Sequence, residues 1–167
     1  ANCFPIGREK RKSLLARGWY KSEHNLGTTK ENKNTTSMQA AFSTDKSQYD
    51  SPNDVNITYT VTNTTQEPVY VSAFYNPLEG VANKGVVEIV DVKTNERRQY
   101  AGVMRKRLPP GPNNFVLVEP GRSVSKTFSV TSFAMLQSGR RYRVEIGERN
   151  TSLVLRSDPN NEATERT

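Results

Sequence analysis

The chain has 167 residues, of which 34% are apolar, and it carries a net charge of +7 with one Cys and one His. This length suits one domain with a core and is too short for two comfortable ones. A single Cys excludes an internal disulfide and any Cys-x-x-Cys metal or redox site. No apolar run approaches the roughly 20 residues that cross a bilayer, so we expect no membrane span.

Residues 1–36 are predicted to be a basic, polar and mostly irregular segment that precedes the domain. Arg8, Lys10 and Arg11 form an Arg-x-Lys-Arg pattern, which basic-specific processing proteases cut; a solvated tail is the alternative. Cys3 is a candidate for an intermolecular disulfide, and a free thiol or a thiolate that blocks a protease zinc are its alternatives. His24 lies in this polar segment, which argues against a catalytic role.

Alternating apolar and polar residues predict a β-sandwich domain over residues 37–157. The alternation begins at Met38 to Phe42. It is strongest from Val55 to Val61, and it recurs from Val69 to Ala73 after the turn-forming stretch Asn63–Glu67. These last two segments are predicted to form a hairpin with one buried face.

Further short segments continue the pattern. Leu108–Asn114 is too rich in Pro and Gly for regular structure and is predicted to be a surface loop. The predicted strands are Val86–Val92 with Arg97–Met104 pairing back on it, a hairpin of Phe115–Val118 and Val124–Val130, Arg140–Gly147, and an edge at Ser152–Arg156. Residues 158–167 are predicted to be a polar tail. Turn signals at this spacing indicate an all-β fold, an Ig-like antiparallel β-sandwich of about seven to nine short strands.

Four Asn-x-Ser/Thr triplets indicate glycosylation, and with it secretion to the cell exterior. Asn56 falls on the polar face of a predicted strand, where a glycan would not disturb packing. The other candidates are Asn34, Asn63 and Asn150, and the last two lie at predicted turns or strand edges.

Several short motifs follow one another along the chain in the same order as in a known protein family. They include Tyr59-Thr60-Val61-Thr62-Asn63, Asn76-Pro77-Leu78-Glu79-Gly80, Tyr100-Ala101-Gly102, Lys106-Arg107-Leu108-Pro109-Pro110 and Glu119-Pro120-Gly121-Arg122-Ser123. In this order the chain resembles, over roughly residues 38–147, the Ig-like pro-region of secreted zinc proteases of the deuterolysin and peptidyl-Lys metalloendopeptidase type. The resemblance implies a role in masking, inhibiting or assisting the folding of a protease.

The chain departs from those proteases in its lack of a catalytic half. Their zinc site needs two imidazoles on one helix in a His-Glu-x-x-His pattern, whereas this chain has one His. Paired acids such as Glu88 with Asp91 are three residues apart and fall on opposite faces of a strand. The sequence therefore nominates no catalytic residue, no metal site and no cofactor, and it favours a protein that is not an enzyme.

Two loops are the candidate contact surface for a protein partner, and a zinc metalloprotease is the candidate partner. They contain Asn76, Pro77, Leu78 and Glu79 in the first loop and Arg105, Lys106, Arg107, Leu108, Pro109 and Pro110 in the second. A stand-alone extracellular enzyme or effector with a new site on the sandwich is one alternative. A module that binds an anionic glycan is another, given the basic clusters, whereas nucleic acid is not favoured because no aromatic residues interleave those clusters.

Overall fold

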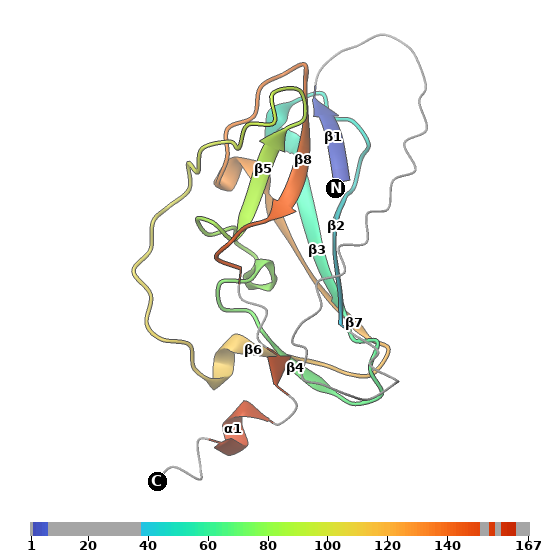
Figure 1. The fold of residues 1–167 in the computed structure, drawn as a ribbon, viewed down its shortest axis with the longest axis vertical. Helices are drawn as coiled ribbons and strands as arrows, with labels where there is room; N and C mark the ends of the chain where they lie inside the picture. The colour runs from blue at the N-terminus through green and yellow to red at the C-terminus, as the bar shows by residue number, and fades with distance from the viewer. Residues whose placement is uncertain (1, 7–37, 151–153, 156–157, 163–167) are drawn as a thin grey trace.

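A computed structural model describes residues 2–6, 38–150, 154–155 and 158–162, and over these residues the protein is all-β (Figure 1). Three antiparallel sheets each contain three strands. The first has the order β1 (Asn2–Ile6), β8 (Arg140–Ile146), β5 (Val87–Asp91); the second β2 (Gln39–Thr44), β3 (Asn56–Thr62), β7 (Ser123–Ser129); and the third β6 (Phe115–Val118), β4 (Val69–Ser72), β9 (Val154–Leu155).

The described helices are all short. Four 3-10 turns, η1 (Pro52–Asp54), η2 (Pro77–Glu79), η3 (Pro112–Asn114) and η4 (Val130–Ser132), interrupt the connections between strands, and α1 (Pro159–Glu162) follows β9. None of these helices is long and apolar enough to pass through a bilayer. The α1 helix lies within the predicted polar tail, where no helix was expected.

The period-2 alternation correctly predicts which side chains β3 buries. Ile57, Tyr59 and Val61 are all buried. On the opposite face, hydroxyl groups pair across β3 and β7, with Thr58–Thr127 at 2.8 Å and Thr60–Ser125 at 2.8 Å between oxygens. One cluster of buried apolar side chains draws on all three sheets, so a single core supports the fold.

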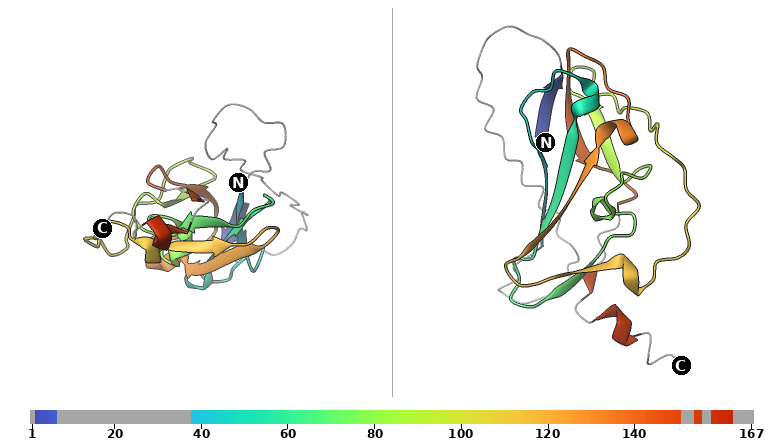
Figure 2. Two further views of the ribbon diagram at one scale, coloured as in Figure 1. Left: turned by 90° about the horizontal axis from the view of Figure 1, so that it is seen from below. Right: turned by 180° about the vertical axis from the view of Figure 1, so that it is seen from behind.

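Both predicted hairpins are wrong. The strand β3 pairs with β2 and β7, and β4 pairs with β6 and β9, so the segments 55–61 and 69–73 belong to different sheets. For the same reason β6 and β7 do not pair with each other. The stretches 63–68 and 119–122 carry the chain from one sheet to the next and run side by side (Figure 2).

Backbone hydrogen bonds tie these two crossings together at Asn63. The N–H of Asn63 donates to the carbonyl of Arg122 at 2.9 Å, and the N–H of Gly121 donates to the carbonyl of Asn63 at 2.8 Å. Turn-forming residues mark where a strand ends, but they do not require the chain to reverse onto its neighbour.

The other strands agree with the alternation, and one was not predicted. The strands β2, β5 and β8 occur where expected, and β9 falls inside the predicted edge segment. Arg97–Met104 was predicted to pair back on β5, but it does so only at one bridge, Arg97 to Val90; Tyr100 instead bridges to Ala134, which follows η4. The unpredicted strand is β1, which lies in the segment expected to be irregular and pairs with β8 along the edge of the first sheet.

Candidate functional site: a three-point anchored loop

Residues 101–111 form a loop without helix or strand that arcs along the outside of the molecule between β5 and η3 (Figure 1). We call it the contact loop. Three groups of interactions hold it: one at its start, one at Arg107 and one at its end.

The start of the contact loop is fixed against the turn that contains η4. The N–H of Ala101 donates to the carbonyl of Phe133 at 2.7 Å, and the Tyr100 hydroxyl donates to the carbonyl of Val103 at 3.1 Å. A Cβ on Gly102 would lie 2.9 Å from the carbonyl oxygen of Ser132, a distance shorter than real Cβ atoms adopt. Glycine at this position therefore allows the two backbones to pack together.

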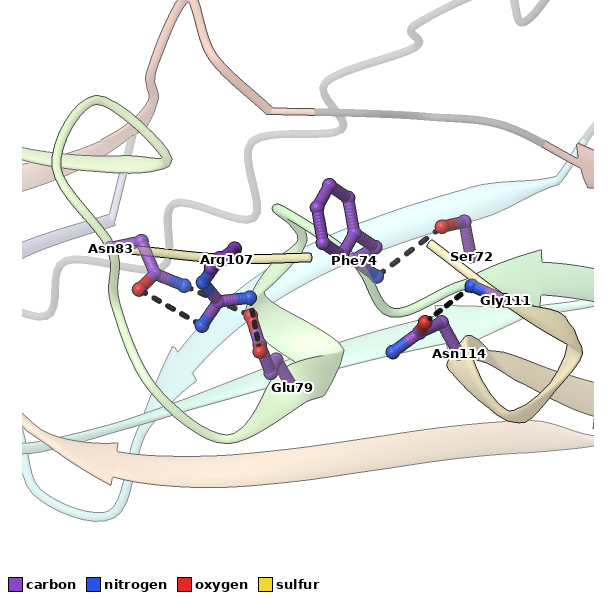
Figure 3. Close-up of polar contacts among 7 residues, drawn as sticks. All are labelled: Ser72, Phe74, Glu79, Asn83, Arg107, Gly111 and Asn114. Atoms are coloured by element: carbon purple, nitrogen blue, oxygen red, sulfur yellow. Dashed lines mark hydrogen bonds and ion pairs between the residues drawn. The ribbon is translucent and has the colours of Figure 1, made fainter. Parts of the chain in front are cut away.

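Arg107 anchors the middle of the loop (Figure 3). Its guanidinium forms an ion pair with Glu79, and Nη2 donates to Asn83 Oδ1 at 3.2 Å. Asn83 Nδ2 in turn donates to Glu79 Oε2 at 2.9 Å, so the three side chains form a closed set of interactions. The guanidinium also lies 5.7 Å from the ring centroid of Phe74 and 5.3 Å from that of Tyr75. We call this group the Arg107 clamp.

The clamp combines interactions that are stronger away from water. The Arg107 side chain is only 14% exposed and the Glu79 side chain 25%. Charge-assisted hydrogen bonds are about twice as strong as neutral ones, and contacts between a cation and an aromatic ring add about 0.5–2 kcal/mol depending on exposure. The clamp therefore fixes this one side chain in a loop that has no regular structure.

The end of the contact loop is stiff and tied to β4. Proline occupies positions 109, 110 and 112, and proline fixes the backbone angle φ. The N–H of Gly111 donates to Asn114 Oδ1 at 2.8 Å (Figure 3). The carbonyl of Asn114 accepts from the N–H of Ala73, the residue after β4, at 2.7 Å.

Between these anchors the loop exposes apolar side chains. Leu108 is 85% exposed, Val103 70% and Met104 69%. Arg105 and Lys106 are also exposed, and neither takes part in an ion pair with any residue that the structure describes. Apolar side chains gathered on one exposed segment are typical of a contact surface.

The structure joins the two predicted contact loops but changes which residues a partner can touch. Asn76, Pro77 and Leu78 are buried, which contradicts a direct contact role. Asn76 caps the 3-10 turn η2 instead, because its Oδ1 accepts from the N–H of Leu78 at 2.9 Å. Glu79 is engaged in the clamp, as is Arg107.

The candidate glycosylation sites differ in their surroundings. Asn56 is exposed on β3 and Asn150 is half-buried. Asn63 is 0% exposed, and its Nδ2, the atom that carries an N-linked glycan, donates to the carbonyls of Glu67 and Val118, each at 2.8 Å. The folded structure therefore contradicts a glycan at Asn63.

Several candidates from the N-terminal segment lie outside the described residues. They are Arg8, Lys10, Arg11, His24 and Asn34. The backbone of Cys3 lies in β1, opposite Arg143 of β8.

The strand register creates a pair of acids that spacing along the sequence did not reveal. Glu88 of β5 lies directly opposite Glu145 of β8. Each carboxylate has its own arginine, Arg97 for Glu88 and Arg143 for Glu145. A pocket of about 200 Å³ adjoins Glu88 and Arg97, below the roughly 300–1,000 Å³ usual for small-molecule sites. Among the described residues, no group of His, Cys, Asp and Glu side chains could hold a metal ion.

Asp91, at the end of β5, is a buried carboxyl group whose surroundings shift its pKa. It is 3% exposed, its Oδ1 accepts from the N–H of Lys93 at 2.8 Å and of Thr94 at 3.3 Å, and Arg140 lies 3.6 Å from Oδ2. Burial alone would raise the pKa of Asp91. The two backbone hydrogen bonds and the charge of Arg140 outweigh this, and they hold the pKa below its ordinary value of 3.8.

This lowered pKa predicts a pH dependence of stability. Its contribution is fully present above pH 3.8 and is lost as the pH falls through the lower pKa of the folded state. We expect acidification from pH 7 to about pH 2 to lower the melting temperature of wild type more than that of Asp91→Asn, as followed by circular dichroism. Asp54→Asn, at an exposed position, should show the wild-type dependence, and an Asp91→Asn profile parallel to wild type would contradict the expectation.

No protein-family model and no curated protein matches this chain at a significant level.

Proposed function

We propose that this chain is an Ig-like β-sandwich that works outside the cell by binding another protein through its contact loop. The observation that carries this proposal is the combination of three exposed apolar side chains, Val103, Met104 and Leu108, with a loop held at three points. A loop that is already fixed loses little conformational entropy when it binds, so more of its contact energy contributes to affinity.

The resemblance to a protease pro-region suggests the kind of partner. A pro-region that masks, inhibits or helps to fold a secreted zinc protease acts through protein contacts and needs no reactive centre of its own. The exposed Arg105 and Lys106 beside the apolar side chains would favour a partner surface that combines apolar and acidic groups.

The polyanion alternative has less support. Three arginines of the predicted basic clusters are engaged in ion pairs within the chain: Arg107 with Glu79, Arg140 with Asp91, and Arg143 with Glu145. The enzyme alternative likewise gains no specific observation from the 200 Å³ pocket.

The test uses a purified deuterolysin-type zinc protease and measures its peptidase activity at increasing concentrations of this chain. We expect wild type to reduce the activity, and Met104→Ser with Leu108→Ser to weaken the effect about 100-fold. Each apolar side chain that would be buried contributes about 1.5 kcal/mol or more, so two give about 3 kcal/mol.

Met135→Ser is the matched control, because Met135 is 74% exposed but lies outside the contact loop. This control should act like wild type. Equal effects of wild type and the double variant would contradict the role of the loop, and no effect of wild type on the protease would contradict this choice of partner.

A further inference from the structure

The contact loop contains a pair of basic residues in a setting that proteases favour. Lys106 and Arg107 are followed by Leu108, which is 85% exposed, in a segment without helix or strand. Exposed loops are the preferred sites of proteolytic nicking. An endoprotease that is specific for paired basic residues takes the second basic side chain, here that of Arg107, into an acidic pocket.

The fold uses that same side chain for its own stability. Arg107 is 14% exposed and is bound by the carboxylate of Glu79, the amide oxygen of Asn83 and two aromatic rings. Lys106 and Leu108 on either side of it are exposed. Arg107, the residue whose side chain the protease must bind, is thus held by the folded chain and is not free to enter the pocket of the protease.

We propose that the Arg107–Leu108 peptide bond is a latent cleavage site for endoproteases specific for paired basic residues, and that the Arg107 clamp controls its use. Cleavage would add water across this bond, leaving a carboxylate on Arg107 and an amino group on Leu108, with the protease regenerated. It would separate Leu108 from Val103 and Met104 and so divide the apolar surface of the loop. The inference goes beyond the proposed function, since it depends on the clamp and not on any partner of the loop.

The clamp and the protease compete for one guanidinium, which makes the cleavage rate a measure of clamp opening. When opening and closing are fast compared with cleavage, the rate follows the population of the open form. Substitutions that weaken the clamp without unfolding the core should therefore raise the rate at this bond alone.

The experiment treats the full chain with a purified kexin-type protease, which cleaves after Lys–Arg pairs, and follows the products by mass spectrometry. Lys10–Arg11 is the same pair elsewhere in the chain, so cleavage after Arg11 serves as an internal reference. We expect Glu79→Gln to increase the rate after Arg107 at least tenfold relative to wild type, with the rate after Arg11 unchanged.

Glu88→Gln is the matched control, because it removes the carboxylate of another arginine–glutamate ion pair, Arg97 with Glu88, outside the clamp. It should leave the rate after Arg107 at the wild-type value. A synthetic peptide of residues 103–111 should be cleaved after Arg107 at least tenfold faster than the folded wild-type chain.

Three results would overturn the proposal: an uncleaved peptide, wild type cleaved as fast as the peptide, or equal rates for wild type and Glu79→Gln. Accelerated cleavage after Arg98 and Arg141 as well would indicate general unfolding of Glu79→Gln. In that case Asn83→Ala decides the question, because it removes the two hydrogen bonds that Asn83 makes with Arg107 and Glu79 and keeps the ion pair of the clamp. A selective increase after Arg107 would support the proposal, and no selective increase would refute it.

Discussion

Replacement of Asn63 by Ala is expected to lower the free energy of unfolding by about 3 kcal/mol. The Asn63 side chain is 0% exposed, and its Nδ2 donates to the carbonyls of Glu67 and Val118, each at 2.8 Å. Its Oδ1 accepts from the N–H of Thr65 at 2.9 Å and from the Thr65 hydroxyl at 2.6 Å. Alanine would remove four hydrogen bonds at a place where water cannot readily replace them.

The position of Asn63 explains why this loss should affect the whole fold. Its side chain and backbone join the two crossings that connect the second sheet to the third. Because the core draws on all three sheets, loosening this junction should destabilise the core as a unit.

Urea denaturation followed by circular dichroism measures the effect. Asn56→Ala is the matched control on the adjoining strand, since Asn56 is exposed, and it should change stability by no more than about 0.5 kcal/mol. Asn63→Asp should also be destabilising, because a carboxylate cannot donate to the carbonyls of Glu67 and Val118. An Asn63→Ala variant as stable as Asn56→Ala would refute this role.

Burial within a strand was predictable from sequence, whereas strand pairing was not. The alternation of β3 identified Ile57, Tyr59 and Val61 as buried because side-chain direction is a local property with a period of two. The partner of a strand depends on contacts between distant residues. Here the Asn63–Glu67 stretch leads to a different sheet. Its polar residues suggested an exposed turn, but Asn63 is buried where the chain crosses from one sheet to the next.

The positions of the two candidate loops were predictable in outline for a similar reason. Proline and glycine identified both loops, since they limit regular structure locally. The link between Glu79 and Arg107 joins residues 28 positions apart, and no local pattern specifies it. Leu78 was expected at the surface because of its loop, but the capped turn η2 directs it into the core.

Substitution of Gly147 by Ala is expected to cost about 3 kcal/mol of stability, for a reason that intrinsic propensities would not suggest. Glycine to alanine ordinarily stabilises a protein by about 0.4–1 kcal/mol through the unfolded chain when the backbone permits it. At Gly147 the added Cβ would lie 2.2 Å from the carbonyl oxygen of Gly85 and 2.5 Å from its carbon. Both are backbone atoms, and two hydrogen bonds hold this backbone in place. The N–H of Gly147 donates to the carbonyl of Val86 at 2.9 Å, and the N–H of Arg149 donates to the carbonyl of Gly85 at 2.8 Å.

Gly111→Ala separates this steric effect from the general effect of adding a methyl group. A Cβ on Gly111 would meet no atom within 4 Å, and its backbone is extended, with φ −118° and ψ 179°. We therefore expect a gain of up to about 1 kcal/mol at Gly111 and a loss at Gly147, measured by urea denaturation of both variants beside wild type. Opposite signs would establish that close backbone contact between the end of β8 and the start of β5 limits residue 147 to glycine, and equal signs would refute it.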